Sequence, residues 1–415
     1  MAGGILANKF REAMRKTKDP RMSDESQISV AYPTGFLNFD FMNGTVVQVN
    51  TEDRSFSYPS VGIQDGCLLV AIGRSGCGKT TWAIQTAANI VRNFDEGVIF
   101  HDDIEGGVTE YRKKILTKFS DEEMQYKYIS RNKGITAENF YERVRELHNQ
   151  KINNQDVYEY DTGKFDPYGN RIFKLQPSIY IIDSIALLMP EQYTEEESLS
   201  GSMSATAAAK VNSMMFKRII PMLKSANIIL IGINHINDKI DINPMQRTKS
   251  KVSYLKQGES LPGGNTIIYL TNILLRFDDN SKFKEDSGFG IPGNLVDIQL
   301  VKSRNSRAGQ TCTLVFDQNN GFDAELSLFI MLKQEGKING AGAYFYIGDR
   351  SDIKFSQKNF KQKLQESSEL REIFMTEVLS VLNEKLMGKL EEDKEEEITE
   401  SVDIVGDIIN KLNVA

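Results

Sequence analysis

The chain contains 415 residues, of which 40% are hydrophobic and 26% are charged, and its formal net charge is −7. This length suits a core of about 250 residues with smaller attachments, and no apolar run approaches the roughly 18 residues that a membrane-spanning helix needs. The first four residues open neither a secretory signal nor a myristoylation motif. The odd number of cysteines, three in a long chain, argues against a disulfide framework, and no cysteine and histidine cluster has zinc-ligand spacing. We therefore expect a cytoplasmic protein without membrane contacts.

The N-terminal segment carries a helical pattern. Leu6, Phe10 and Met14 recur at every fourth position and predict an amphipathic helix over 5–17, followed by a polar linker. A helix of this length is not stable alone. It docks either on its own core or, as we favour, on a neighbouring copy. We assign residues 1–30 to this helix and its linker.

A phosphate-binding motif lies between a predicted strand at 67–72 and a predicted helix at 80–92. The motif, G-x-x-x-x-G-K-T, comprises Gly73, Arg74, Ser75, Gly76, Cys77, Gly78, Lys79 and Thr80, and Thr81 follows it. Its glycines allow backbone N–H groups to point at phosphates, Lys79 reaches the β- and γ-oxygens, and Thr80 is placed to bind Mg²⁺. We therefore predict a site for ATP or another nucleoside triphosphate with Mg²⁺. A glycine-rich turn without phosphate is the alternative.

Two more predicted strands lead into carboxylates. The strand at 97–101 precedes Asp102, Asp103 and Glu105, and the strand at 178–183 ends in Asp183. Asp183 is expected beside the Mg²⁺ water shell, and a helix N-cap is the alternative. Glu105 is our candidate for orienting or deprotonating an attacking water. Asp102 and Asp103 are the other candidates for this role. The alternative is that these carboxylates form a solvated acidic turn with no catalytic role.

Helical and strand patterns alternate along the middle of the chain. Helices are predicted at 109–119, 136–149 and 205–225, and strands at 227–233, 267–277, 295–302 and 311–316. This alternation predicts an α/β fold with a mostly parallel twisted sheet, in a core covering residues 31–323. Within the core, residues 151–175 have the pattern of an exposed hairpin insertion.

Residues 324–415 are predicted to form a smaller α+β domain. It would contain a strand at 342–348, helices over 356–386 and a solvated acidic segment near the C-terminus.

Two polar segments are candidates for binding nucleic acid. The first follows Asn234 and His235, lacks periodicity for about 25 residues and carries a set of cations: Lys239, Arg247, Lys249, Lys251 and Lys256. A locally basic loop can contact phosphates even on an acidic protein. Asn234 or His235 is placed to sense a γ-phosphate, with a satisfied polar side chain as the alternative. The second segment, at about 194–204, contains Ser202 and Met203, and either caps the next helix or contacts phosphate.

Lys302 and Arg304 lie at positions i and i+2, on one face of a strand end. If this edge meets the nucleotide of a neighbouring subunit, the two cations can neutralise charge that develops on its γ-phosphate. A surface cation pair without such a role is the alternative.

Together these residues resemble the RecA-type recombinases, and most closely the phage UvsX-like branch. The resemblance covers roughly residues 33–385, and its motifs fall on 73–80, 103–105, 182–190, 233–235, 261–265, 302–304 and 342–346. It gives Glu105 the water-activating role, Asn234 with His235 the role of a switch, and Lys302 with Arg304 the reading of a neighbour's nucleotide. Tyr111 matches the tyrosine that stacks on adenine.

The resemblance implies an ATP-dependent DNA recombinase. Such a protein would assemble into a helical filament on single-stranded DNA, pair it with homologous double-stranded DNA, and act with single-strand-binding and loader proteins, in the host cytoplasm if phage-encoded. The DNA-binding residues would be Ser202, Met203, Arg247, Lys249, Lys251, Lys256, Gly263, Gly264 and Asn265. A hexameric replicative helicase of the same ATPase superfamily and a nucleotide-gated DNA-binding scaffold are the alternatives. Arg74, Cys77 and the length of the 236–262 loop depart from the family pattern.

Overall fold

The computed structural model describes residues 29–50, 55–167, 169–193, 202–238, 254–262, 266–283 and 289–391. From Ala31 onward the described residues belong to one compact unit. The predicted N-terminal helix lies outside the described residues, as do six of the predicted DNA-binding residues: Arg247, Lys249, Lys251, Gly263, Gly264 and Asn265.

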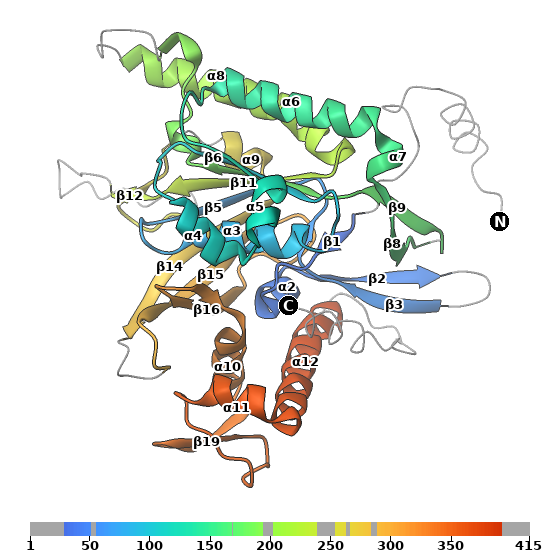
Figure 1. The fold of residues 1–415 in the computed structure, drawn as a ribbon, viewed down its shortest axis with the longest axis vertical. Coiled ribbons are helices and arrows are strands. Elements are labelled where there is room, and N and C mark those ends of the chain that lie inside the picture. Colours follow the sequence, from blue (N-terminus) through green and yellow to red (C-terminus); the bar gives the residue numbers. More distant parts are fainter. Residues whose placement is uncertain are drawn as a thin grey trace. The chain divides into compact units, whose positions relative to one another are not determined.

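A nine-stranded sheet forms the centre of this unit, in the order β17-β16-β15-β14-β5-β11-β10-β6-β7 (Figure 1). In chain order its strands are β5 (Leu68–Gly73), β6 (Val98–Asp103), β7 (Tyr128–Arg131), β10 (Ser178–Asp183), β11 (Ile228–His235), β14 (Ile273–Phe283), β15 (Gly293–Ser303), β16 (Thr311–Asp317) and β17 (Gly321–Asp323). The strands from β14 to β7 in this order are parallel, and those from β14 to β17 are antiparallel. The predicted α/β fold with a mostly parallel sheet is confirmed.

Helices cover both faces of the sheet (Figure 1). On one face lie α6 (Ala137–Asn153), α8 (Ser202–Ser225) and α9 (Thr266–Leu270), which share a hydrophobic cluster with alternate residues of β5, β10 and β11. The other face carries α3 (Lys79–Val91), which contacts β5, β6, β10 and β11, and α4 (Glu110–Thr117), which packs on α3. Because both faces are covered, the central strands are continuous buried apolar runs.

The other described elements that precede the C-terminal region are short. In chain order they are β1 (Ala31–Tyr32), α2 (Leu37–Met42), β2 (Thr45–Asn50), β3 (Ser55–Ser60), β4 (Ile63–Gln64), α5 (Asp121–Lys127), α7 (Gln155–Tyr158), β8 (Glu159–Phe165), β9 (Arg171–Leu175), the 3₁₀ turns Ile185–Leu187 and Glu191–Tyr193, β12 (Asn237–Asp238) and β13 (Glu259–Ser260). Among the described helices, none combines the length and apolar character needed to cross a membrane.

Two predicted elements differ from the structure. The predicted strand at 267–277 is wrong in its first half, where α9 precedes β14. Ile267 and Ile268 pack into the cluster formed with α6 and α8, and a short apolar run does not distinguish a buried helix from a strand. The hairpin predicted at 151–175 begins only at β8, because α6 and α7 occupy the residues before it.

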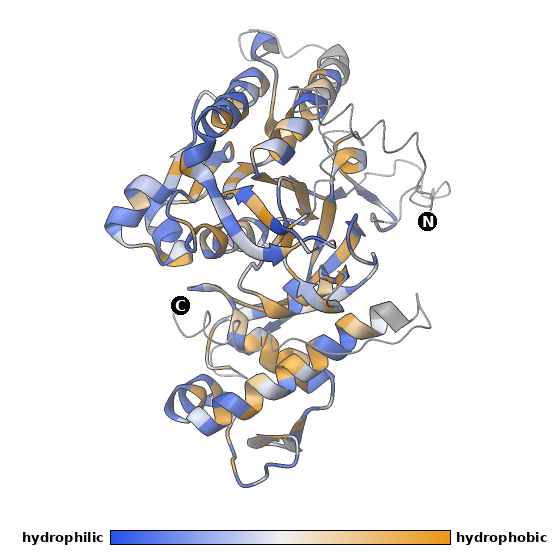
Figure 2. Ribbon diagram, turned by 90° about the vertical axis from the view of Figure 1, so that its right-hand side faces the viewer, coloured by the Kyte–Doolittle hydropathy of each residue, from blue (hydrophilic) through white to orange (hydrophobic). Residues whose placement is uncertain are grey.

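The C-terminal elements are α10 (Ala324–Gln334), β18 (Ile338–Ala341), β19 (Tyr344–Ile347), α11 (Phe360–Glu366) and α12 (Ser368–Glu391). Phe329, Phe360 and Phe374 lie at the centre of their hydrophobic cluster, and Figure 2 shows apolar residues along these helices. Leu37 and Phe41 of α2 belong to the same cluster. The predicted domain division at 323/324 stays a prediction, and it would cut through this shared core.

Candidate functional site

The predicted phosphate-binding loop connects β5 to α3 at the carboxyl edge of the sheet. Gly76 and Gly78 have φ angles of 81° and 83°, in the region that favours glycine. A Cβ on Gly78 would also lie 2.7 Å from the Phe322 ring. Because no side chain caps the N-terminus of α3, its first N–H groups are available to an anion.

Lys79 lies folded over this loop. Its Nζ donates hydrogen bonds to the carbonyl oxygens of Gly73 (3.0 Å) and Arg74 (2.8 Å), and it lies 3.4 Å from Nδ1 of His235. The side chain is buried, so its charge depends on these carbonyls. Bound phosphate oxygens would offer stronger, charged acceptors.

Thr80 and Asp183 form the predicted metal position. Oγ1 of Thr80 donates a 2.6 Å hydrogen bond to Oδ2 of Asp183, while Oδ1 of Asp183 is buried and has no partner among the described residues. Burial, helped by the nearby charges of Glu105 and Asp103 and opposed by the Thr80 hydrogen bond, raises the pKa of Asp183 to about 6. A hydroxyl beside an unsatisfied carboxylate oxygen fits a hard, oxygen-binding cation such as Mg²⁺.

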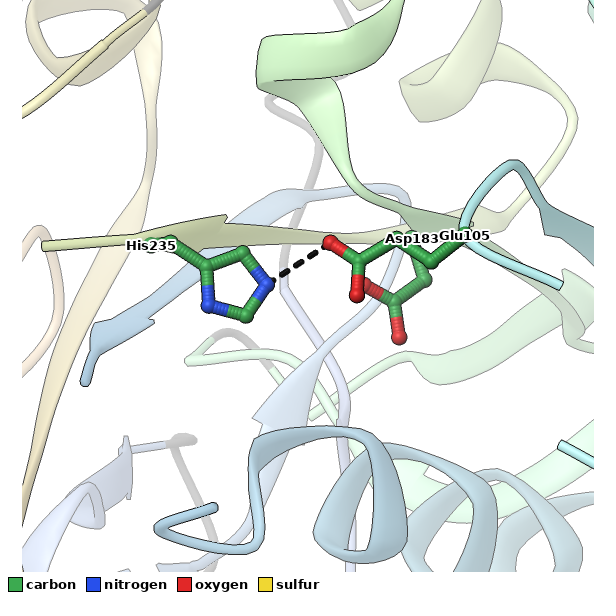
Figure 3. Close-up of side chains that lie close together, drawn as sticks. All are labelled: Glu105, Asp183 and His235. Atoms are coloured by element: carbon green, nitrogen blue, oxygen red, sulfur yellow. Dashed lines mark hydrogen bonds and ion pairs between the residues drawn. The ribbon is translucent and has the colours of Figure 1, made fainter. Parts of the chain in front are cut away.

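Glu105, Asp183 and His235 converge at the same point (Figure 3). One ligand atom from each lies within 4.8 Å of the others, and Nε2 of His235 is 2.8 Å from Oε1 of Glu105. Glu105 also lines a cavity of about 260 Å³, with Thr80, Thr81, Asp103, Gly107, Val108, Arg112, Leu116 and Asp183. His235 therefore lies between the candidate catalytic carboxylate and the loop lysine.

The two rival carboxylates have other partners. Asp102 is buried, forms an ion pair with Arg143 and accepts a 2.6 Å hydrogen bond from Tyr180 Oη. Because side chains alternate along β6, Asp102 faces the α6 side of the sheet, away from the loop. Asp103 accepts hydrogen bonds from the backbone N–H groups of Gly107 and Val108. The geometry favours Glu105 for activating a water.

Asn234 and His235 end β11 next to β5. Nδ2 of Asn234 donates to the carbonyl oxygen of Pro262 at 2.8 Å, and the N–H of Ile236 donates to the carbonyl oxygen of Gly73 at 3.1 Å. The end of the predicted DNA-binding loop thus contacts Asn234, and its first residue contacts the phosphate-binding loop.

Lys302 and Arg304 lie far from the loop of their own chain. Lys302 pairs with Leu274 in the sheet, and Leu274 pairs with Val70, whereas the phosphate-binding loop begins at Gly73. Three residues of strand span about 10 Å. Lys302 donates to the carbonyl oxygens of Ile268 and Tyr269, and burial lowers its pKa. Arg304 is exposed.

Tyr111, predicted to stack on adenine, is 77% exposed and lines a separate hollow with Lys114, Ile115, Lys118 and Phe119. The next residue, Arg112, lines the cavity beside the phosphate-binding loop, and its guanidinium donates to the carbonyl oxygen of Asn319. Sequence reasoning missed Arg112. Adjacent residues of a helix point in different directions, so the helical period of α4 could have shown that Tyr111 and Arg112 lie on different faces.

The described part of the predicted DNA-binding set is small. Ser202 and Met203 begin α8. Lys256 pairs with Asp278 at 3.2 Å, so it is not a free cation.

No family model matches the chain. Protein RecA of Ureaplasma parvum is 23% identical over 316 residues, which cover 74% of this chain and 78% of that protein. Protein RecA of Thermotoga neapolitana is 23% identical over 198 residues, or 47% of this chain and 52% of the relative. A protein of Dictyostelium discoideum named mitochondrial DNA repair protein recA homolog is 26% identical over 220 residues, which cover 52% of this chain and 43% of that protein.

The fold and these similarities define an α/β protein with a RecA-like core. The similarities also support a relationship to the RecA family.

Proposed function

We propose that this protein is an ATP-dependent DNA recombinase of the phage UvsX-like type, which forms filaments on single-stranded DNA and pairs them with a homologous duplex. The observation that carries the proposal is the convergence of Lys79, Thr80, Asp183, Glu105 and His235 at one edge of the sheet. Similarity to proteins named RecA supports the recombinase over other uses of such a site.

Each residue has a role in ATP hydrolysis. Lys79 exchanges the carbonyls of Gly73 and Arg74 for β- and γ-phosphate oxygens. Thr80 and Asp183 would hold Mg²⁺, which neutralises phosphate charge when bound. Glu105 orients a water and accepts its proton. His235, between Glu105 and Lys79, meets any γ-phosphate that enters this space and transmits its presence to the residues that follow.

A second copy completes the site in this proposal. Lys302 and Arg304 are too far from their own phosphate-binding loop to contact its nucleotide. In this proposal they act instead on the nucleotide of a neighbouring subunit, as an arginine finger does. A filament supplies such a neighbour at every position.

The basic segment after His235 would bind DNA through its phosphates. Replacing Arg247, Lys249 and Lys251 with Ala should weaken single-strand binding and reduce the slope of log affinity against log salt by up to about 0.7 for each lost phosphate contact. ATP binding should survive, because none of the three lies in the phosphate-binding loop.

Strand-pairing assays test the function directly. With ATP, wild-type protein should pair a single strand with a homologous duplex but not with a scrambled one, and electron microscopy with a non-hydrolysable ATP analogue should show open helical filaments. Closed rings with directional unwinding of a forked duplex would indicate a helicase instead. DNA binding without either activity would indicate a scaffold.

A further inference from the structure

A two-stranded ladder closes the base of the segment that follows His235. Its strands are β12 and β13, and Asp238 lies directly opposite Glu259. We call residues 236–238 and 254–262 the stem. Like charges that face each other across a ladder destabilise it unless each finds a positive partner.

Glu259 has a permanent partner in Arg276. The guanidinium donates to both carboxylate oxygens of Glu259, at 2.7 and 2.9 Å, and each of these side chains is only 4% exposed. Hydrogen bonds from Arg276 lower the pKa of Glu259, so this carboxylate is charged at neutral pH. Arg276 also donates to the carbonyl oxygen of Tyr254. One strand of the stem is thereby fixed to β14.

Asp238 has a more exchangeable partner in Arg74, the second residue of the phosphate-binding loop. The guanidinium contacts the two carboxylate oxygens at 2.5 and 3.3 Å, and the side chains are 61% and 67% exposed. An exposed pair of this kind contributes little stability and is readily exchanged. The two sides of the Asp238–Glu259 rung therefore differ: one is buried and fixed, and the other depends on the loop.

A bound triphosphate would disturb the exchangeable side. Lys79 donates to the carbonyl oxygens of Gly73 and Arg74, so phosphates that attract Lys79 remove hydrogen bonds at the base of Arg74. The triphosphate also brings several negative charges to the loop, and they compete with Asp238 for the guanidinium. Once Arg74 moves, Asp238 loses its own positive partner opposite the Glu259 carboxylate, while Glu259 keeps Arg276.

We propose that Arg74, Asp238 and Glu259 act as a charge switch that loosens the stem when a triphosphate is bound. Arg74 is a positioning residue here: it acts through the rung rather than on reacting atoms. The switch rests on the proposed function, because it requires a triphosphate in the loop. Linkage makes it reciprocal, so a polyanion that holds the stem open raises the affinity for nucleotide.

Hydrogen exchange of the stem amides tests the switch without DNA. In wild-type protein, a saturating non-hydrolysable ATP analogue with Mg²⁺ should speed exchange of the stem amides by roughly two- to fivefold, the range for losing one exposed ion pair. Asp238→Asn removes the repulsion, so its stem should stay slow in both states. Arg74→Ala leaves the carboxylates facing each other, so its stem should already be fast without nucleotide.

Arg350→Ala is the matched control. It removes an exposed arginine that pairs with Asp352 and Glu369 in the C-terminal region, and it should keep the wild-type response. Titration with a fluorescent ATP analogue measures nucleotide binding separately for each variant. The switch is overturned if wild-type protein binds nucleotide without a change in stem exchange, or if Arg74→Ala responds as the wild type does. If wild-type protein binds no nucleotide, the proposed function fails together with the switch.

Discussion

Oγ1 of Thr80 and Oδ2 of Asp183 lie 2.6 Å apart, although 103 positions separate the two residues in the chain. The parallel order β5-β11-β10 brings them together, because it places the carboxyl ends of these strands at one edge. Glu105 and His235 reach this edge from β6 and β11. The candidate site is therefore a product of strand order, and its residues can be tested one at a time.

Lys79 and Glu105 should affect different steps. Lys79→Ala should abolish nucleotide binding, because it removes the cation that contacts the β- and γ-phosphates. Glu105→Gln should bind ATP but hydrolyse it about 10²-fold more slowly or worse, because its amide cannot accept the proton. Equilibrium binding and steady-state hydrolysis measure the two effects. Near-normal turnover in Glu105→Gln, with a large loss in Asp103→Asn, would transfer the role to Asp103.

Lys302 and Arg304 should act across an interface. A double variant, Lys302→Ala with Arg304→Ala, should lose DNA-stimulated hydrolysis. Mixing it with Lys79→Ala protein should restore part of that hydrolysis. In the mixture, some interfaces join an intact loop to an intact cation pair. Hydrolysis across a range of mixing ratios is the measurement. Co-assembly of the two variants without any recovery would argue that the cations serve their own subunit or its fold.

Variants of Arg112 and Tyr111 distinguish two hypotheses about where the nucleoside part of the nucleotide binds. Arg112 and Leu116 line the cavity together with Thr81, and a planar guanidinium can stack on a base. We expect Arg112→Ala to weaken ADP binding by roughly 5- to 100-fold, as the loss of one base-stacking contact would. Inorganic triphosphate should bind as before. Tyr111→Ala is the neighbouring control, and a larger loss in it would restore the assignment that the family resemblance implies.

Lys151 should make stability depend on pH. Its Nζ donates to the carbonyl oxygens of Gln176 and Asn227, and burial lowers its pKa to about 7 from an ordinary 10.5. Between these values the unfolded chain binds a proton that the folded chain does not. The free energy of unfolding should therefore rise with pH across that window.

Relative to Lys151→Met, the wild type should gain up to about 2 kcal/mol between pH 7 and 9. Urea denaturation at several pH values measures both proteins. Parallel pH profiles for the two would show that Lys151 is protonated equally in both states.

The sequence alone determined the features that depend on neighbouring residues. The glycines and Lys79 define the phosphate-binding loop through their spacing, and the apolar runs before Gly73 and up to Asp183 predict the buried strands around it. These patterns are readable because backbone conformation and burial on two faces impose local requirements on residue type.

Tertiary structure decided the features that depend on the direction of a side chain and on the pairing of strands. Asp102 and Asp103 are adjacent in the chain but face opposite sides of β6, and only the sheet shows which side meets the loop. Strand order placed Lys302 about 10 Å along the sheet from the level of Gly73. In the Asp238–Glu259 rung, Asp238 pairs with Arg74 and Glu259 pairs with Arg276, and these two arginines lie far apart in the sequence. Such contacts arise from packing between elements, which local patterns do not encode.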